Sequence, residues 1–334
     1  MRAPKVLGLL AGTAAIALAA LTVAAPASAA TLPPGQKITI VEVEDIPTPG
    51  EGQFFNVNPA HAASTPVGTG SGEFLTGLEV NDDGIGFAIG NFDHEGEIGF
   101  VPTIWNADAN TGTISGPQPL HFAPGDYPDS CEGIDLNPTT GELLIACEQY
   151  EVPELGNVST VSSVDTTTGL LTAVVLLSGE DFQPFNALAY NAVTGVLWGF
   201  GPVELDNSFI IDRTLQTATL EGFMDNNVYG ADFDRNGQLF LASQLFEDDS
   251  DVEFPSLAVT DPFSDDFTSN EWFVDTTDDT TMIFVASLTI WGKLAATGST
   301  TGAETAPIAI GSALLLLAGA AFVATSRIGR RKTA

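Results

Sequence analysis

The chain has 334 residues, of which 43 are Asp or Glu, ten are Lys or Arg and two are Cys, and its formal net charge is −33. So acidic a chain repels nucleic acid and anionic lipid, which excludes nucleic-acid binding and leaves cations, basic partners or solubility as reasons for the charge. Once both ends are set aside, the remaining length suits one large all-β domain or two small ones.

Residues 1–30 have the pattern of a secretory signal peptide. Two basic residues, Arg2 and Lys5, precede an apolar stretch over 6–25, and the segment closes on ASAA at 27–30, small residues that a signal peptidase accepts. Polar sequence follows at once, which argues against the alternative of a membrane-spanning start. We therefore expect the chain to be exported.

A short turn signature, Asp or Asn followed by two residues and Thr-Gly, recurs through the middle of the chain. It lies between runs rich in Val, Ile, Leu and Phe. The copies are Asp108–Gly112, Asn137–Gly141, Asp165–Gly169 and Asn191–Gly195, with degenerate copies at 81–84 and 234–237. The Asx side chain caps such a turn and Gly supplies the positive φ, so each copy predicts a β-hairpin.

The predicted hairpins are of two alternating kinds, and the first strand of one kind has a small residue, Gly or Ala, near its start. Its copies are LTGLEV at 75–80, CEGIDL at 131–136, FNALAY at 185–190 and VYGADF at 228–233. Two hairpins every 40–55 residues make four strands per repeat, which is the blade of a β-propeller. Gly77, Gly133, Ala187 and Gly230 would let inner strands approach closely around the axis.

The repeats predict an all-β ectodomain at 31–293 with five four-stranded blades. Four blades are expected at 70–120, 128–178, 182–222 and 225–275. The fifth would combine 281–294 with 37–45, and also with 54–57, which closes the ring and leaves no open sheet edge. A β-sandwich is the competing architecture, because it also has many short strands separated by turns.

The two cysteines flank a predicted hairpin, EGIDLNPTTGELLIA. A turn centred near Thr139 places Leu136 near Glu142 and Cys131 opposite Cys147. Directly opposed positions bring the Cβ atoms within bridging range, so we expect a cross-hairpin disulfide. Free thiols or a metal-binding pair are the alternatives, although no Cys–His cluster has zinc spacing.

Three features follow one another at the C-terminus, in segment 294–334. They are Leu294-Ala295-Ala296-Thr297-Gly298, a 19-residue apolar span over 307–325, and a tail with Arg327, Arg330, Arg331 and Lys332. A helix rising about 1.5 Å per residue crosses a hydrocarbon core of roughly 30 Å in 20 residues or so. The basic tail would stay in the cytoplasm.

This order resembles the cell-wall sorting signal of Gram-positive surface proteins, with Ala in place of the usual Pro of LPxTG. The LAxTG form resembles the substrates of class E sortases of actinobacteria. The resemblance implies a membrane-inserted precursor that is cleaved between Thr297 and Gly298. The Thr carbonyl would pass through a sortase thioester to an amine of the peptidoglycan precursor, leaving the protein in the cell wall. A plain single-span membrane protein is the alternative.

Residues 70–290 resemble secreted bacterial propellers of the quinoprotein-like and YVTN-like repeat type. That resemblance implies a fold and transfers no catalytic residue. No nucleophile elbow, Walker loop, dinucleotide fingerprint or HExxH motif occurs. His61, His94 and His121 are expected in loops. The sequence over 232–237 mimics the start of a Ca²⁺ loop, but Ser243 stands where a Glu is required, so a hairpin turn is the better interpretation.

Acidic loops join the second and third strands of the predicted blades and would share one face with the starts of the inner strands. We expect a ligand- or cation-binding face there, with Ca²⁺ as a candidate ion, against the alternative of ordinary solvation. The candidate residues are Glu95, Glu97, Glu132, Glu148, Glu151, Asp181, Asp206, Asp248 and Asp249.

The sequence therefore favours a surface protein with a binding, adhesive or structural role and no demonstrated reaction. The main alternative is an extracellular hydrolase acting on glycans. Five-bladed glycosidases carry carboxylates at the channel mouth, and acidic residues also stand near the inner strands here: Glu73, Glu132, Asp181 and Asp225. A wall-coat protein without a ligand is a third interpretation.

Overall fold

The computed structural model divides the chain into two units, Met1–Leu294 and Ala295–Ala334, and all the described residues belong to the first. The described residues are 31–42, 52–94, 99–178, 182, 185–201, 207–223, 227–246, 253–260, 269–275 and 283–293. The expected signal peptide at 1–30 and sorting signal at 294–334 lie outside these ranges. Every element within them is a strand, and they include no helix long and apolar enough to cross a membrane.

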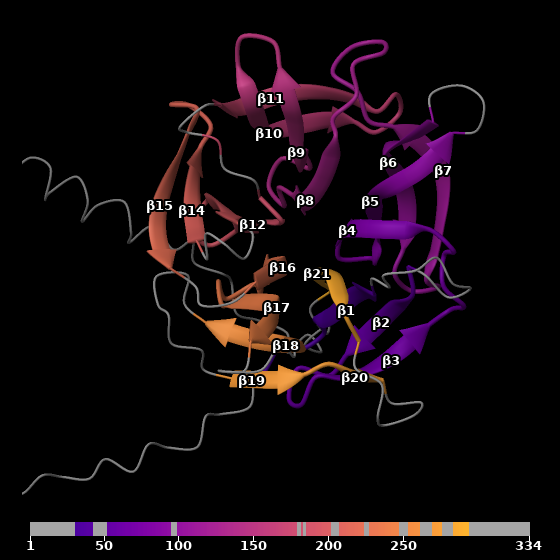
Figure 1. The fold of residues 1–334 in the computed structure, drawn as a ribbon. Helices are drawn as coiled ribbons and strands as arrows, with labels where there is room; N and C mark the ends of the chain where they lie inside the picture. Colours follow the sequence, from indigo (N-terminus) through magenta and orange to yellow (C-terminus); the bar gives the residue numbers. More distant parts are fainter. Residues whose placement is uncertain are drawn as a thin grey trace, which may run out of the picture. The chain divides into compact units, whose positions relative to one another are not determined.

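Five antiparallel sheets form the blades (Figure 1). Blade 1 runs β4 (Phe74–Val80), β5 (Ile85–His94), β6 (Gly99–Asp108), β7 (Thr113–Pro119). Blade 2 runs β8 (Ser130–Leu136), β9 (Leu143–Val152), β10 (Gly156–Asp165), β11 (Leu170–Ser178). Blade 3 runs β12 (Ala187–Asn191), β13 (Val196–Phe200), β14 (Asn207–Asp212), β15 (Thr217–Phe223). Blade 4 runs β16 (Asn227–Phe233), β17 (Leu239–Phe246), β18 (Glu253–Thr260), β19 (Ser269–Trp272).

Blade 5 is built from both ends of the domain, as the sequence predicts. From the centre outward it contains β21 (Val285–Trp291), β1 (Lys37–Glu42), β2 (Phe54–Val57), β3 (Ala63–Val67) and β20 (Val274–Asp275). The Trp291 indole Nε1 donates to Thr39 Oγ1 at 2.8 Å across this seam. Strand β3 was not predicted, and β20, which was expected within the fourth blade at 225–275, instead adds a short parallel pairing to β3.

The blades form a closed ring, which confirms the propeller and rules out the sandwich. The inner strands β4, β8, β12, β16 and β21 each lie beside the next, and β21 lies beside β4 (Figure 1). Five buried apolar clusters each draw on two adjacent blades; between blades 1 and 5, for example, Trp105 packs in the same cluster as Trp291. The core therefore lies between blades, where each sheet buries its faces against its neighbours.

The Asx turns have the geometry that their sequence predicts. Asn137 Oδ1 accepts the backbone N–H of Thr139 at 2.9 Å, and the Gly141 N–H donates to the Asn137 carbonyl at 2.8 Å. Gly141 has a φ of 71°. The degenerate copy at 234–237 is also a hairpin turn, because Asp234 Oδ1 accepts two backbone amides, from Asn236 and Gln238.

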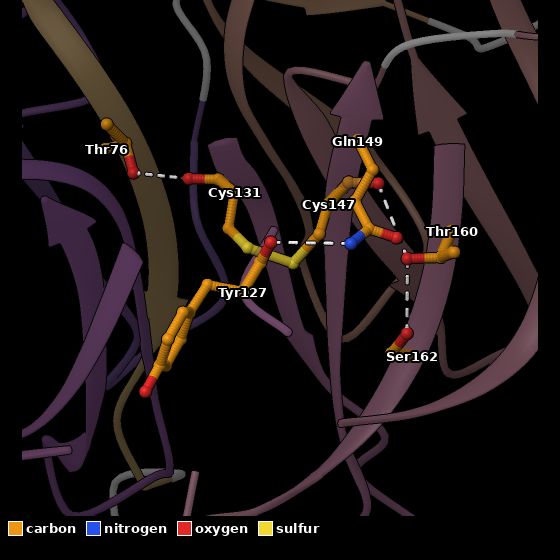
Figure 2. Close-up of a disulfide and its surroundings, with 7 residues drawn as sticks. All are labelled: Thr76, Tyr127, Cys131, Cys147, Gln149, Thr160 and Ser162. Carbon is orange, nitrogen blue, oxygen red and sulfur yellow. Dashed lines mark hydrogen bonds between the residues drawn. A yellow bond between two sulfur atoms is a disulfide. The ribbon is translucent and has the colours of Figure 1, made fainter. Parts of the chain in front are cut away.

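The disulfide Cys131–Cys147 is present and crosses the hairpin between β8 and β9 (Figure 2). The predicted register was one residue off, because Leu136 pairs with Leu143 rather than lying near Glu142. A β-bulge between Cys131 and Ile134 inserts one extra residue into β8 and restores the cysteine pairing.

Removing this disulfide should destabilise the domain substantially. The bridge closes a loop of 16 residues, for which the chain-entropy estimate is about 3 kcal/mol. We expect the Cys131→Ala/Cys147→Ala variant to lose about that much free energy of unfolding in urea titrations. A reductant should lower the stability of the parent protein to a similar degree and leave the variant unchanged. An equal effect of the reductant on both proteins would contradict the prediction.

Candidate functional site

A pocket of about 250 Å³ lies at the face where the inner strands begin, called here the start face. Four inner strands or the residues directly before them contribute Thr76, Glu132, Asn186 and Tyr229 to its wall. Each of these directly precedes the small residue of its blade, so the propeller repeat itself brings them together. The other lining residues are Phe74, Asn91, Ser130, Cys131 and Ala286.

The carboxyl of Glu132 is the strongest candidate for chemistry in this pocket. Burial, and secondarily the charge of Glu148, raise the pKa of Glu132 to about 7. A carboxyl with such a pKa can donate or accept a proton near neutral pH. The disulfide anchors this segment, because Cys131 is the preceding residue and its carbonyl accepts a hydrogen bond from Thr76 Oγ1 at 2.7 Å (Figure 2).

Glu148 lies beside Glu132 but is held by a second set of contacts. The Tyr150 hydroxyl donates to Glu148 Oε2, and the Tyr150 backbone N–H donates to Asp129 Oδ2 at 2.6 Å. Burial is the main cause that raises the pKa of Glu148, while the bond from Tyr150 lowers it. Burial and this same hydrogen bond raise the pKa of Tyr150. Glu148 is thus a buried acid linked through Tyr150 to the exposed Asp129 at the rim of blade 2.

Only part of the predicted acidic face falls on described residues. Glu132 and Glu148 lie together, whereas Glu151 lies near the end of β9 with a φ of 57°. Glu95, Glu97, Asp181, Asp206, Asp248 and Asp249 lie outside the described residues, as does Asp225 of the glycosidase alternative. The face as a whole therefore stays a prediction. Glu73 lies just before β4 and does not line the pocket.

The histidines are separate from one another. His61 lies in the turn between β2 and β3, and His121 lies just after β7. His94, expected in a loop, ends strand β5 and its Nε2 shares a hydrogen bond with Thr103 Oγ1 at 2.9 Å. Across the residues that the structure describes, no group of three or more His, Cys, Asp or Glu side chains is arranged to hold a metal ion.

A second cavity, of about 440 Å³, lies at the opposite face, where the inner strands end in Asx turns, called here the turn face. Three buried carboxylates from inner strands line it: Glu79, Asp135 and Asp232. The sequence analysis missed Glu79 and Asp135 and considered Asp232 only as the start of a Ca²⁺ loop. Their signal was nevertheless present, because each stands two residues after the small residue of its repeat, at 77, 133 and 230.

Comparison with known proteins assigns no family to the chain. No family model and no curated protein matches the chain. One similar solved structure is a protein of unknown function from Bacteroides caccae, with 12% identity, a TM-score of 0.37 and coverage of 75% of this chain and 77% of that one. A proposed 6-phosphogluconolactonase from Bacteroides fragilis has 11% identity and a TM-score of 0.42, with 77% and 98% covered. The native arabinanase of Bacillus subtilis has 13% identity and a TM-score of 0.37, with 63% and 77% covered.

The order of the strands in the five sheets shows that this protein is a five-bladed β-propeller, in which strands from both ends of the domain form the last blade. The structural neighbours are too distant to argue for a ligand or a reaction.

Proposed function

We propose that the chain is a surface-displayed binding protein that takes a polar, hydroxyl-rich ligand, a glycan, in the start-face pocket. The observation that carries this proposal is the convergence of Thr76, Glu132 and Asn186, from three different blades, on one hollow beside the Phe74 ring. Alcohol, amide and carboxyl groups match sugar hydroxyls, and an aromatic ring packs against the apolar face of a sugar. The pocket is slightly smaller than the roughly 300–1,000 Å³ of typical small-molecule sites, which favours a terminal sugar unit.

Glycan-array binding tests this proposal directly. The full chain should bind a subset of glycans, and Glu132→Gln or Asn186→Ala should weaken that binding by about tenfold or more. Asn186→Ala leaves a sugar hydroxyl without its partner, and Glu132→Gln replaces one acceptor oxygen by an NH₂ group that cannot accept. Glu151→Gln is the matched control for charge; it lies on the same blade outside the pocket and should bind like the parent. Pocket variants that bind as well as the parent would remove the proposed site.

A glycan hydrolase is the second candidate, favoured by the pKa of about 7 at Glu132 beside a second carboxyl, Glu148. A protonated Glu132 could protonate a leaving glycosidic oxygen while another carboxylate acts on the opposite side of the sugar. Release of reducing ends from array-positive glycans, abolished in Glu132→Gln, would favour the hydrolase. Binding without release would favour the binding protein.

The proposed location is the cell wall, reached through the signal peptide at 1–30 and the sorting signal at 294–334. Thr297→Ala should move the protein from the peptidoglycan fraction to the membrane fraction, since the sortase then no longer finds the Thr side chain that marks the carbonyl it attacks. Thr300→Ala, outside the pentapeptide, is the control and should leave the protein in the wall. Fractionation before and after muramidase digestion measures both. Unchanged wall attachment in Thr297→Ala would contradict sorting at this position.

A further inference from the structure

The turn-face cavity gathers more acidic side chains than its protein contacts can pair. Glu79, Asp135 and Asp232 occupy equivalent positions on three inner strands, and Asp234 joins them two residues after Asp232. Arg235 is the only basic residue among those lining the cavity in the described part of the chain. Its Nη2 contacts Asp82 Oδ1 at 2.6 Å and the Gly292 carbonyl, whereas its buried Nη1 has no hydrogen-bond partner among the described residues.

Two of the carboxylates also have a structural role at the edges of the inner strands. Asp232 Oδ1 accepts the N–H of Phe233 at 2.6 Å, and Oδ2 accepts the N–H of Ile290 in β21 at 2.5 Å. Glu79 Oε2 accepts the Thr289 hydroxyl at 3.0 Å. These carboxylates accept hydrogen bonds from backbone N–H groups and a hydroxyl of the inner strands, which is a structural reason for acidic side chains at these positions.

This structural role does not account for Asp135 and Asp234, the other buried acids of the cavity. Asp135 is only 4% exposed and Asp234 only 1%, yet the Oδ2 atom of each has no hydrogen-bond partner in the described part of the chain. A buried carboxylate oxygen without a partner is costly, so a site that keeps two of them beside an open cavity suits a ligand that supplies donors. Asn81 and Asp82 on the cavity wall are exposed to solvent, so a ligand can reach it.

The ligand that supplies these hydrogen-bond donors should be an organic cation rather than a metal ion. The described side chains form no cluster with metal-binding geometry. An ammonium group instead donates up to three hydrogen bonds and is tolerant of their directions. Tyr190 and Phe233 also line the cavity and supply aromatic surface, against which an alkylammonium packs well.

We propose that the turn-face cavity is a second binding site, for a small aliphatic amine whose ammonium group donates hydrogen bonds to Asp135 Oδ2. Asp234 Oδ2 is the acceptor for a second donor, so a diamine fits the site better than a monoamine. This site is independent of the glycan pocket, which lies at the opposite ends of the inner strands.

Isothermal titration of the purified full chain with 1,4-diaminobutane at pH 8, above the pKa of about 7 that burial gives Asp135, tests the proposal, with 1,4-butanediol as the neutral analogue of similar shape. We expect the diamine to bind and the diol not to bind. Asp135→Asn, which keeps the shape and removes the charge, should weaken diamine binding by about tenfold or more. Asp234→Asn, in which the side chain can still cap its turn, provides a second variant should Asp135→Asn fail to fold.

Two controls separate this site from general attraction to an acidic protein and from the glycan pocket. Asp165→Asn makes the same charge change at an exposed turn of blade 2, and Glu132→Gln alters the start-face pocket; both should bind the diamine like the parent. The proposal is overturned by equal binding of diol and diamine, by undiminished binding in both cavity variants, or by equal losses in Asp165→Asn. Binding of CaCl₂ in place of the diamine would also overturn it, in favour of a metal site.

Discussion

Replacing Gly230 with Ala should destabilise the propeller by more than about 3 kcal/mol, above the usual range for an overpacked site. A Cβ atom at this position would lie 2.7 Å from the Ser287 carbonyl carbon and closer still to the Leu288 amide nitrogen. Both obstacles are backbone atoms of β21, so no side-chain rotation can relieve the contact. Because β21 begins the blade that closes the ring, the clash should loosen the contact between blades 4 and 5.

Two variants at the equivalent positions of blades 2 and 3 show how the loss of stability should depend on the space around the Cβ atom. Gly133→Ala occupies the equivalent position in blade 2, but there the new Cβ would lie 3.0 Å from its nearest neighbours, so the cost should be clearly smaller. Ala187→Gly removes the methyl group that blade 3 already accommodates and should cost about 1 kcal/mol, mainly through chain entropy. Urea unfolding of the three variants measures the order. A cost for Gly230→Ala no greater than that for Gly133→Ala would contradict the crowding argument.

The sequence was informative wherever one local pattern carries one local geometry. An Asx residue four positions before Gly predicted the turns, since the cap and the positive φ are properties of a few adjacent residues. The spacing of small residues predicted the blades because the same backbone crowding recurs at each inner strand. The cysteine pairing was also correct, although the reasoning assumed a straight hairpin and overlooked the bulge beside Gly133.

The candidate sites were harder to predict because their residues combine only after the ring has closed. Sequence reasoning sought acids in the loops, where charge is conspicuous, and at the starts of the inner strands, where it identified Glu132. It passed over Glu79 and Asp135 and weighed Asp232 only as the start of a Ca²⁺ loop, because their strands otherwise look like ordinary buried strands. Whether such an acid faces the axis or a neighbouring blade depends on the bulge two residues earlier, which alters the alternation of the strand.

The buried acids should make this protein more stable at pH 5 than at pH 8. Burial raises the pKa of Asp135 to about 7, and burial together with mutual repulsion raises the pKa of Glu79 and Asp232 well above the ordinary values. The native state therefore holds protons that the unfolded chain has released above about pH 4. The stabilisation is fully present below the unfolded pKa and is lost as pH rises through about 7.

The expected size follows from the same linkage, at about 1.4 kcal/mol for each pH unit over which only the native state is protonated. Asp135 alone should account for about 2–3 kcal/mol of the loss between pH 5 and pH 8. Asp135→Asn cannot ionise, so its unfolding free energy should fall less over that range by about this amount. Thermal and urea unfolding across pH 4–9 measure the difference.

An exposed acid provides the control for general charge repulsion in so acidic a chain. Hydrogen bonds from the Thr167 backbone and the Thr168 side chain lower the pKa of Asp165, so its own contribution is lost only as pH falls below about 4. Asp165→Asn removes the same charge and should retain the pH dependence of the parent between 5 and 8. If Asp165→Asn and Asp135→Asn flatten the profile equally, repulsion over the whole surface, rather than the buried acids around the axis, sets the response to pH.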